Sequence, residues 1–466
     1  MRLKFLVQIT DDEGVPGEIQ EIVSLSKGTE GPEDLGLTLA DGKTILAVAQ
    51  QRLVESQVKY WTEARRCCTL CGHRRRGNGS YPIVFRTLYG DVTLDSPRFR
   101  RCPCNATEKA SIAPLVALIP QHIAPERLYL ETRWAALVPY AAAAELLADV
   151  LPIASGANAT TIRDHVMMVA KQAEAELPKG KCSFLDGCPA EWAELPIPGG
   201  RMVVGLDGGY VRDCKDRRNN FEVIVGRSMA DDGSFRYVGY VNGLDRHPKR
   251  RLVRMLMSQG VQANQDITFL TDGGREILPL TQMISPCSEH VLDWFHITMK
   301  ITVLGQFVKG LAHCDEEAGA EYAKLLERIK WKLWNDNANG ALELIDELKD
   351  NLDDLKTTYQ NRRKFVKLVR EFRIYIKSNV GSLVNYGERY RAGEHISSAF
   401  VEATVNAVIS KRFAKKQQMQ WSKSGAHLLL QARTRALDGT LRPMFERWHP
   451  GMANDNAKAS DQREVA

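Results

Sequence analysis

The sequence predicts a multidomain α/β protein, and three observations support that fold class. The chain has 466 residues, 44% of them hydrophobic, which is enough to form more than one buried core. Strand-like and helix-like segments alternate between residues 201 and 299, and long segments on both sides carry apolar residues at helical spacing. No apolar run approaches the roughly 20 residues needed to cross a bilayer. We therefore expect a cytoplasmic protein with no membrane partner.

Basic residues are clustered rather than spread evenly. The formal net charge is only +6, and any single run of lysine and arginine can be plain solvated surface. Several runs together favour a polyanionic partner, most simply nucleic acid. The runs are "RRC" and "HRRR" between residues 65 and 76, "RFRR" at 98–101, "KDRR" at 215–218, "HPKRR" at 247–251 and "KRFAKK" at 411–416.

Two closely spaced cysteine pairs predict a metal site near the N-terminus. Cys68 and Cys71 form a C-x-x-C pair, and Cys102 and Cys104 form a later C-x-C pair. Thiolates at such spacing are typical ligands of one structural Zn²⁺, although ordinary buried thiols would give the same pattern.

The segment between the cysteine pairs favours a zinc ribbon over residues 61–106. It reads as two strands joined at "YGD", which would bring the two pairs together. Cys67 is the spare cysteine, and His73 could replace one of the four ligands. The arginines around the ribbon fit a contact with DNA or RNA, whereas a zinc ion that only supports the fold would look the same.

Residues 107–180 are expected to be helical. Two amphipathic stretches are separated by a polar break, with "NATTIRDHV" supplying the start of the second. This arrangement suits a DNA-binding helix-turn-helix, but a plain helical pair is an alternative. Residues 1–60 form an N-terminal region, and the proline- and glycine-rich residues 181–200 read as a linker.

From residue 201 the pattern is that of a mixed sheet with helices on both faces. "RMVVGL", "NNFEVIVGRS" and "FRYVGYVNG" read as three consecutive strands, followed by a basic helix and the strands "DITFLTDGG" and "EHVLDWFHI". This is the element order of an RNase H-like core. In that order Asp207 ends the first strand, Asp272 ends the fourth, and the two strands are neighbours.

Both aspartates precede a glycine pair, in "LDGG" and "TDGG". One such motif would most simply be a turn. Two of them, each after a buried strand, indicate one side of a divalent-metal site, because glycine lets the backbone turn and lets a phosphate come close.

A third acidic residue is expected from a later helix. After a long helical stretch, Glu402 lies among apolar residues in "FVEATVN", in line with Ser398 and Asn406. Glu388 and Glu394 are alternatives, but they lie in the loop "YGERYRAGEHI".

Taken together, these motifs resemble the insertion-sequence transposases of the ISKra type, relatives of the ISL and Mutator-like groups among the DDE transposases. The resemblance runs through the cysteine pairs, "ALVPYAAAAELLADVLPI", "NATTIRDHV", "GLDGGYVR", "TDGG", "VLDWFHI", "FVEATVN" and "QMQWSKSGAHLLLQARTRALDG". It implies an RNase H-like core in two parts, residues 201–299 and 396–449, separated by a helical insertion over 300–395. The tail, 450–466, is expected to be disordered.

The resemblance also implies a catalytic triad of Asp207, Asp272 and Glu402 that holds two Mg²⁺ or Mn²⁺ ions, with support from Asp293 and His296. The implied reaction is cleavage at the terminal inverted repeats and transfer of the freed 3′-hydroxyl to target DNA. The expected partners are double-stranded DNA and further copies of the chain, in a homodimer or larger synaptic assembly associated with the nucleoid.

A set of basic and aromatic side chains is expected to contact DNA, with Trp421 stacking on a base unless it is simply part of the core. Two other functions remain open: a DNA-binding protein with an inactive core, and a structure-selective nuclease on the same scaffold. The expected DNA-binding residues are Arg74, Arg75, Arg76, Arg100, Arg101, Arg212, Lys215, Arg217, Lys411, Arg412 and Trp421.

Overall fold

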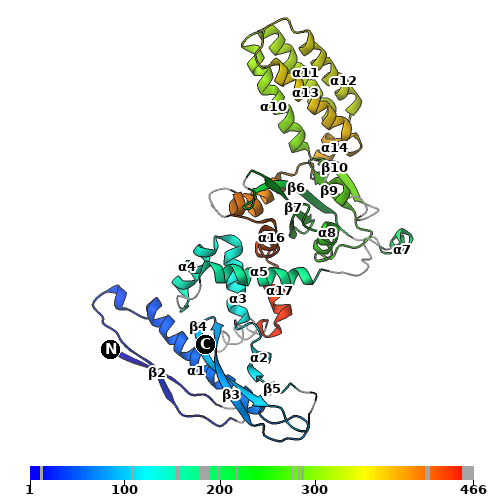
Figure 1. Cartoon of the computed structure of the whole chain (residues 1–466). Helices are drawn as coiled ribbons and strands as arrows, with labels where there is room; N and C mark the ends of the chain where they lie inside the picture. Colours follow the sequence, from blue (N-terminus) through cyan, green and yellow to red (C-terminus); the bar gives the residue numbers. More distant parts are fainter. Residues whose placement is uncertain are drawn as a thin grey trace. The chain divides into compact units, whose positions relative to one another are not determined.

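The protein divides into two compact units (Figure 1). Unit 1 combines Met1–Ala170 with Gly439–Ala466, and unit 2 is Lys171–Asp438. Among the described residues, no helix is both long and apolar enough to cross a membrane. The computed structural model describes residues 1–10, 14–105, 107, 109–153, 158–177, 188–196, 199–216, 218–274, 277–281, 284, 288–414 and 420–453.

Unit 1 is built around a long helix that packs on an antiparallel hairpin. Val54 and Val58 of the helix pack with Val92 and Leu94 of the hairpin. The predicted pair of strands is therefore confirmed, and it turns at Gly90, whose φ is +118°. The described elements of unit 1 are β1 (Arg2–Val7), β2 (Gln20–Ser26), η1 (Pro32–Asp34), α1 (Leu39–Ala64), β3 (Gly77–Thr87), β4 (Gly90–Arg100), β5 (Ser111–Ile112), α2 (Pro114–Leu118), α3 (Pro125–Leu137), α4 (Tyr140–Val150), α5 (Ala159–Ala175, which continues into unit 2), α17 (Leu441–Trp448) and η4 (Pro450–Met452).

The predicted first helix of the 107–180 region is in fact two helices, α3 and α4. The break falls at Val138, which takes an extended conformation with ψ of 168°. Proline disfavours helical backbone in the residue before it, and Pro139 follows Val138 directly.

A buried ion network ties the hairpin of unit 1 to its helices. The fully buried Arg127 donates to Glu131 at 2.8 Å, to the carbonyl of Thr87 at 3.3 Å and to Asp91. His165 on α5 bonds the other oxygen of Glu131. Because buried charges are costly unless paired, this network holds β3, β4, α3 and α5 in one arrangement.

The C-terminal boundary of unit 2 differs from the predicted boundary at residue 449. Gly439 has a φ of +77°, which suits a helix-ending turn, and the chain then returns to unit 1. There Arg442 forms an ion pair with Glu126 at 2.8 Å, and its guanidinium also donates to the carbonyl of Met452 at 2.8 Å. The predicted disordered tail begins with a short helix at residues 450–452. Residues 454–466 lie outside the described residues.

Unit 2 contains a five-stranded mixed sheet in the order β10-β9-β6-β7-β8. Only β7 runs against the other strands, so the predicted mixed sheet and element order are confirmed. The described elements are α7 (Pro189–Ala193, inside the predicted linker), β6 (Met202–Arg212), β7 (Asn220–Ala230), β8 (Phe235–Val241), α8 (Pro248–Met257), β9 (Ile267–Thr271), α9 (Leu278–Thr281), β10 (Ser288–Leu292), α10 (Trp294–Ala312), α11 (Glu316–Trp334), α12 (Ala338–Asp354), α13 (Arg362–Ser378), η2 (Val380–Ser382), α14 (Tyr386–Arg391), α15 (Ala399–Val405), the π-helix η3 (Asn406–Ala414) and α16 (Lys423–Leu437).

Helices cover both faces of the sheet in unit 2. Leu252 and Leu256 of α8 pack with Leu206 on one face. On the other face, α15 and η3 lie over β6, and Leu430 of α16 lies over Gly239 of β8. The expected helical insertion is a bundle of α10, α11, α12 and α13 with its own apolar core (Figure 1).

Candidate functional site

The two predicted aspartates of unit 2 lie side by side in the sheet. The last parallel pair between β6 and β9 is Leu206 with Thr271, so Asp207 and Asp272 are the next residues in register on adjacent strands. The prediction that Asp207 ends its strand is wrong, because β6 runs on to Arg212, paired with β7. Asp207 instead marks the point where pairing with β9 stops.

The glycines around Asp207 allow a helix to lie directly on the strand. Successive side chains in a strand alternate between faces, so positions 205, 207 and 209 share one face. A Cβ at Gly205 would lie 1.8 Å from Val401, and one at Gly209 would lie 2.7 Å from Ile409. Gly205 and Gly209 therefore make room for α15 and η3, and the turn expected after Asp207 is wrong. The turn after Asp272 is confirmed by Gly273, with φ of +78°.

We predict that Gly209→Val lowers the free energy of unfolding by about 1–3 kcal/mol, as overpacked cores do. The added side chain would displace Ile409 and hence the segment that follows Glu402. Gly208→Ala is the control, because its Cβ points to the other face, where it would lie 2.9 Å from the carboxylate end of Glu222 and at an ordinary contact distance of 3.6 Å from Ile224. Chemical denaturation of both variants measures the difference, and equal destabilisation would contradict this packing.

Asp207 and Asp272, called the acidic pair from here on, lie near other charged side chains that affect the pKa of Asp207. Burial raises the pKa of Asp207 to about 6, and the charges of Asp272 and Asp293 add to the rise, while the Gly208 amide and His296 oppose it. A buried carboxyl group of this kind is costly to ionise without a cation nearby, as is expected of a metal-binding acid.

Asp293 is fully engaged in hydrogen bonds rather than available to a ligand. Its Oδ1 accepts from the Phe295 amide at 2.9 Å and the Ser398 amide at 2.8 Å. Its Oδ2 accepts from His296 Nδ1 at 2.6 Å and from the Ser398 hydroxyl. Burial would raise the pKa of Asp293, but the bonds from His296, Ser398 and Phe295 outweigh it and lower the pKa. Asp293 therefore joins the start of α10 to the start of α15, the helix that carries Glu402.

The negative charges of Asp207 and Asp272 affect the pKa of His296. Burial alone would lower its pKa, but the bond to Asp293 and the charges of Asp207 and Asp272 outweigh burial and raise it.

We predict that Asp293→Asn destabilises the protein by about 1–3 kcal/mol, because an amide NH₂ in place of Oδ2 can no longer accept the hydrogen bonds from His296 and the Ser398 hydroxyl. The same change should reduce any activity of the acidic site by loosening α15. Asp315→Asn is the matched control, since Asp315 also caps a helix through the Ala318 amide, at 3.0 Å, but lies in the insertion. Thermal unfolding separates the two; a loss no greater than that of the control would refute the positioning role.

Glu402 is exposed on α15. This helix packs on the face of the sheet to which Asp207 belongs. Among the described residues, the only set of three or more candidate ligands with donor atoms within 4.8 Å is a cysteine set, so the three carboxylates are not gathered this closely. Of the alternatives, Glu394 pairs with Arg201 at 2.7 Å, and Glu388 is an exposed residue in the first turn of α14.

Sequence reasoning missed the residues that support Asp272 from the insertion. His290 bonds the Thr271 hydroxyl at 2.7 Å and the Ser382 hydroxyl at 2.6 Å, and Thr271 in turn accepts from the Gly273 amide at 3.0 Å. The buried Asn379 packs against Gly273 so closely that a Cβ there would lie 2.5 Å from its Oδ1. These partners are distant in the sequence, so no local pattern could have indicated them.

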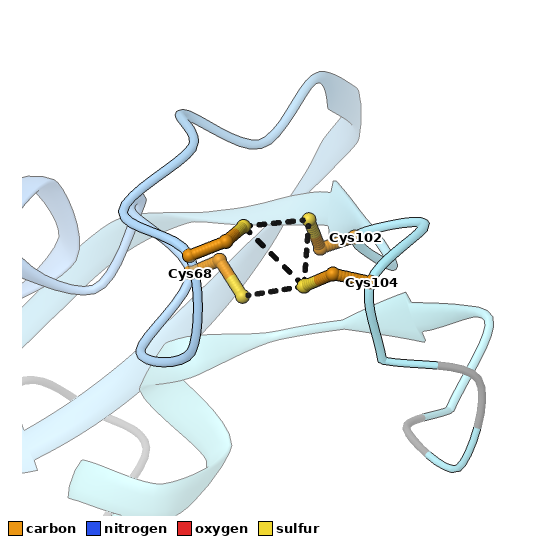
Figure 2. Close-up of side chains that lie close together, drawn as sticks. Cys68, Cys102 and Cys104 are labelled. Carbon is orange, nitrogen blue, oxygen red and sulfur yellow. Dashed lines mark hydrogen bonds between the residues drawn. The ribbon is translucent and has the colours of Figure 1, made fainter.

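The four predicted cysteine ligands converge in unit 1 (Figure 2). Adjacent sulfur atoms lie 3.3–3.5 Å apart, close to the roughly 3.8 Å edge of a tetrahedron with Zn–S bonds of about 2.3 Å. Backbone N–H groups of Cys71 and Leu70 lower the pKa of Cys68 to about 6, whereas the neighbouring sulfurs raise that of Cys104. The cluster of Cys68, Cys71, Cys102 and Cys104 could therefore hold a structural zinc ion.

The expected DNA-contacting side chains divide into exposed and buried groups. Arg75 is buried and donates to backbone carbonyls of Arg65 and Cys67. Arg412 and Trp421 are also buried, with the guanidinium 5.1 Å from the indole centroid. These three are not presented to solvent, and the core alternative fits Trp421. Arg217 lies outside the described residues; Arg74, Arg76, Arg100, Arg101, Arg212, Lys215 and Lys411 are exposed.

No family model and no curated protein matches this chain. Among solved structures, the chain is similar to the Drosophila P element transposase in a strand transfer complex. The identity is 11%, the TM-score is 0.24, and the match covers 70% of this chain and 80% of that chain.

Proposed function

We propose that this protein is a DDE transposase that binds the terminal inverted repeats of its insertion sequence, cleaves DNA strands with the aid of divalent metal ions, and joins the freed 3′ ends to target DNA. One observation carries the proposal. Asp207 and Asp272 are next to each other where the parallel pairing of β6 with β9 ends, in a sheet with the strand order of an RNase H-like core.

The donor set fits magnesium or manganese. Carboxylate oxygens are the ligands that these ions prefer, and a buried carboxylate beside two others gains most from a bound cation. Asp207, Asp272 and Glu402 would hold two such ions, which supply activation of the attacking oxygen and stabilisation of the leaving oxygen when bound.

The surrounding residues position these groups. Asp293 fixes both the start of α15 and the ring of His296, and His296, when protonated, would attract a substrate phosphate. Hydrolysis breaks one phosphodiester bond and leaves a 3′-hydroxyl. That hydroxyl then attacks a target phosphorus and displaces another 3′-oxygen, so joining needs no external energy and no covalent enzyme intermediate.

The exposed basic residues of each unit would hold DNA phosphates. The β3–β4 hairpin with its cysteine cluster, together with helices α3 to α5, would recognise the ends of the insertion sequence. Because two ends must be joined, we propose a homodimer or larger synaptic assembly acting on double-stranded DNA at the nucleoid. Arg212, Lys215 and Lys411 are the exposed candidates near the acidic site in sequence.

The test is cleavage of DNA that carries the sequences flanking the gene, in Mg²⁺ or Mn²⁺. Wild type should nick these ends, whereas Asp272→Asn and Glu402→Gln should bind but not nick. Glu388→Gln is the matched control and should nick normally. Metal-dependent cutting of branched DNA without joining would favour a structure-selective nuclease, and binding without any cutting would favour an inactive core.

A further inference from the structure

A second candidate site lies at the β8 edge of the sheet in unit 2. It is a pocket of about 590 Å³ at the end of β8, where the chain passes through Asp245–His247 into α8. That volume falls within the usual range for small-molecule sites, about 300–1,000 Å³. The pocket is lined by Lys171, Glu174, Leu177, Leu244, Asp245, Arg246, His247, Arg250, Ser424, His427 and Leu428.

Both acidic residues of this pocket form ion pairs with the same arginine. Arg251, buried behind the pocket, pairs with Glu174 at 2.7 Å and with Asp245 at 2.7 Å. Burial would raise the pKa of Glu174, but the bonds from His427 and Arg251 outweigh it and lower the pKa to about 2. Arg251 therefore offsets one of the two negative charges and holds both carboxylates in place.

The cationic side chains of the pocket are turned outward. Lys171 and Arg246 are exposed and make no ion pair with any described residue. The helices α8 and α16 both begin here, at His247 and Ser422. Helix N-termini carry partial positive charge and free N–H groups, so two helices and two unpaired cations favour an anion at one place.

Three leucines, Leu177, Leu244 and Leu428, supply apolar surface to the lining of the pocket. Leu244 is 38% exposed. A simple phosphate would use only the cationic rim, whereas a nucleotide presents a phosphate together with a flat ring that can cover leucine side chains.

The pocket lies at the same end of the sheet as the acidic pair. Gly209 pairs with Val223, and Val223 pairs with Val241, whose amide donates to His427 at 3.3 Å. At about 4.8 Å per strand, β8 is roughly 10 Å across the sheet from β6. One DNA strand could therefore run from the acids to the pocket.

We propose that this pocket binds one nucleotide of a DNA strand, with Lys171 and Arg246 on its phosphate and the leucines against its base. The inference deepens the proposed function, on which it rests for the identity of the strand. A free mononucleotide shares the same chemistry, so the test separates the two sources.

The experiment measures binding of fluorescein-labelled (dT)₁₀ by anisotropy, with no added Mg²⁺ or Mn²⁺ so that the acidic site plays no part while any zinc on the cysteines is kept. Lys171→Glu/Arg246→Glu should weaken binding at least tenfold, and Leu244→Asn should weaken it severalfold. The matched double variant Lys324→Glu/Arg328→Glu, on the exposed side of α11, should change it less than twofold. Thermal melts of all variants check that they fold.

Competition identifies the source of the ligand. Unlabelled (dT)₁₀ should compete far better than dTMP, and inorganic phosphate should not compete at the same concentration. Three results would each overturn the proposal. The Lys171→Glu/Arg246→Glu variant could bind (dT)₁₀ as tightly as wild type, or dTMP could compete as well as unlabelled (dT)₁₀. A polyglutamate peptide could also compete as well as unlabelled (dT)₁₀.

Failure here is distinguishable from failure of the proposed function. If Asp272→Asn abolishes cleavage but the pocket variants bind (dT)₁₀ normally, only this inference falls. If the pocket variants lose (dT)₁₀ binding but no metal-dependent cleavage is found, the nucleotide site stands and the transposase proposal falls.

Discussion

Replacing Asp207 with asparagine is expected to abolish strand cleavage and, at the same time, to stabilise the metal-free protein. Burial together with Asp272 and Asp293 raises the pKa of Asp207 to about 6, so the folded state holds this proton more tightly than the unfolded state. Stability therefore falls as pH rises from about 4 to about 6, and the loss persists at higher pH. Asparagine carries no charge and avoids that loss.

The expected size follows from about 1.4 kcal/mol per pKa unit. Asp207→Asn should raise the free energy of unfolding by about 1–3 kcal/mol at pH 7.5 and change it little below pH 4, while lowering cleavage by about a thousandfold or more. Calorimetry at the two pH values measures the first effect. Mg²⁺ should raise the melting temperature of wild type but not of the variant.

Asp354→Asn is the matched control for Asp207→Asn. Asp354 is an exposed aspartate at the end of α12, so its change should alter neither stability nor cleavage. A variant at Asp207 that is no more stable than wild type at pH 7.5, or that still cleaves, would contradict the role assigned to this residue.

The second large effect concerns the cysteine cluster. Cys104 has three sulfur neighbours within 3.5 Å, so Cys104→Ser should reduce bound zinc from one ion per chain to none. Structural zinc binding is worth on the order of 10–16 kcal/mol in small zinc domains, so unit 1 should lose the fixed arrangement of β3 and β4. Metal analysis measures the zinc, and hydrogen exchange measures protection of the hairpin amides.

Cys67→Ser is the matched control for the cluster. Cys67 lies outside the four-cysteine set, and so does His73, whose carbonyl accepts from the Cys68 amide at 2.9 Å. Cys67→Ser and His73→Ala should each retain one zinc ion. Loss of zinc in either variant would mean that the ligand set differs from Cys68, Cys71, Cys102 and Cys104.

Much of unit 2 could be predicted from the sequence because its signals are local. Apolar runs ending in "LDGG" and "TDGG" mark two strands, and the order of the five strands then makes Asp207 and Asp272 neighbours. The cysteine pairs were equally predictable, since ligand spacing is a property of short loops.

The remaining features depend on contacts between distant residues. The length of β6 beyond Asp207 is set by pairing with β7, and the glycines serve Val401 and Ile409 rather than a turn. Arg412 belongs to a basic run, but it is buried against Trp421. Local composition does not indicate which basic residues are buried. A count of basic residues in the sequence therefore overestimates the number of side chains that can contact DNA.

Strand transfer with pre-cleaved ends is the most direct test of the claim that Asp207, Asp272 and Glu402 form one catalytic metal site. The substrate is a labelled duplex that ends in a free 3′-hydroxyl at the element terminus, mixed with plasmid target and Mg²⁺. We predict that wild type joins the label to the plasmid, and that Asp207→Asn, Asp272→Asn and Glu402→Gln each bind the duplex but join none of it. Joining by any of these variants at the wild-type rate would contradict the claim.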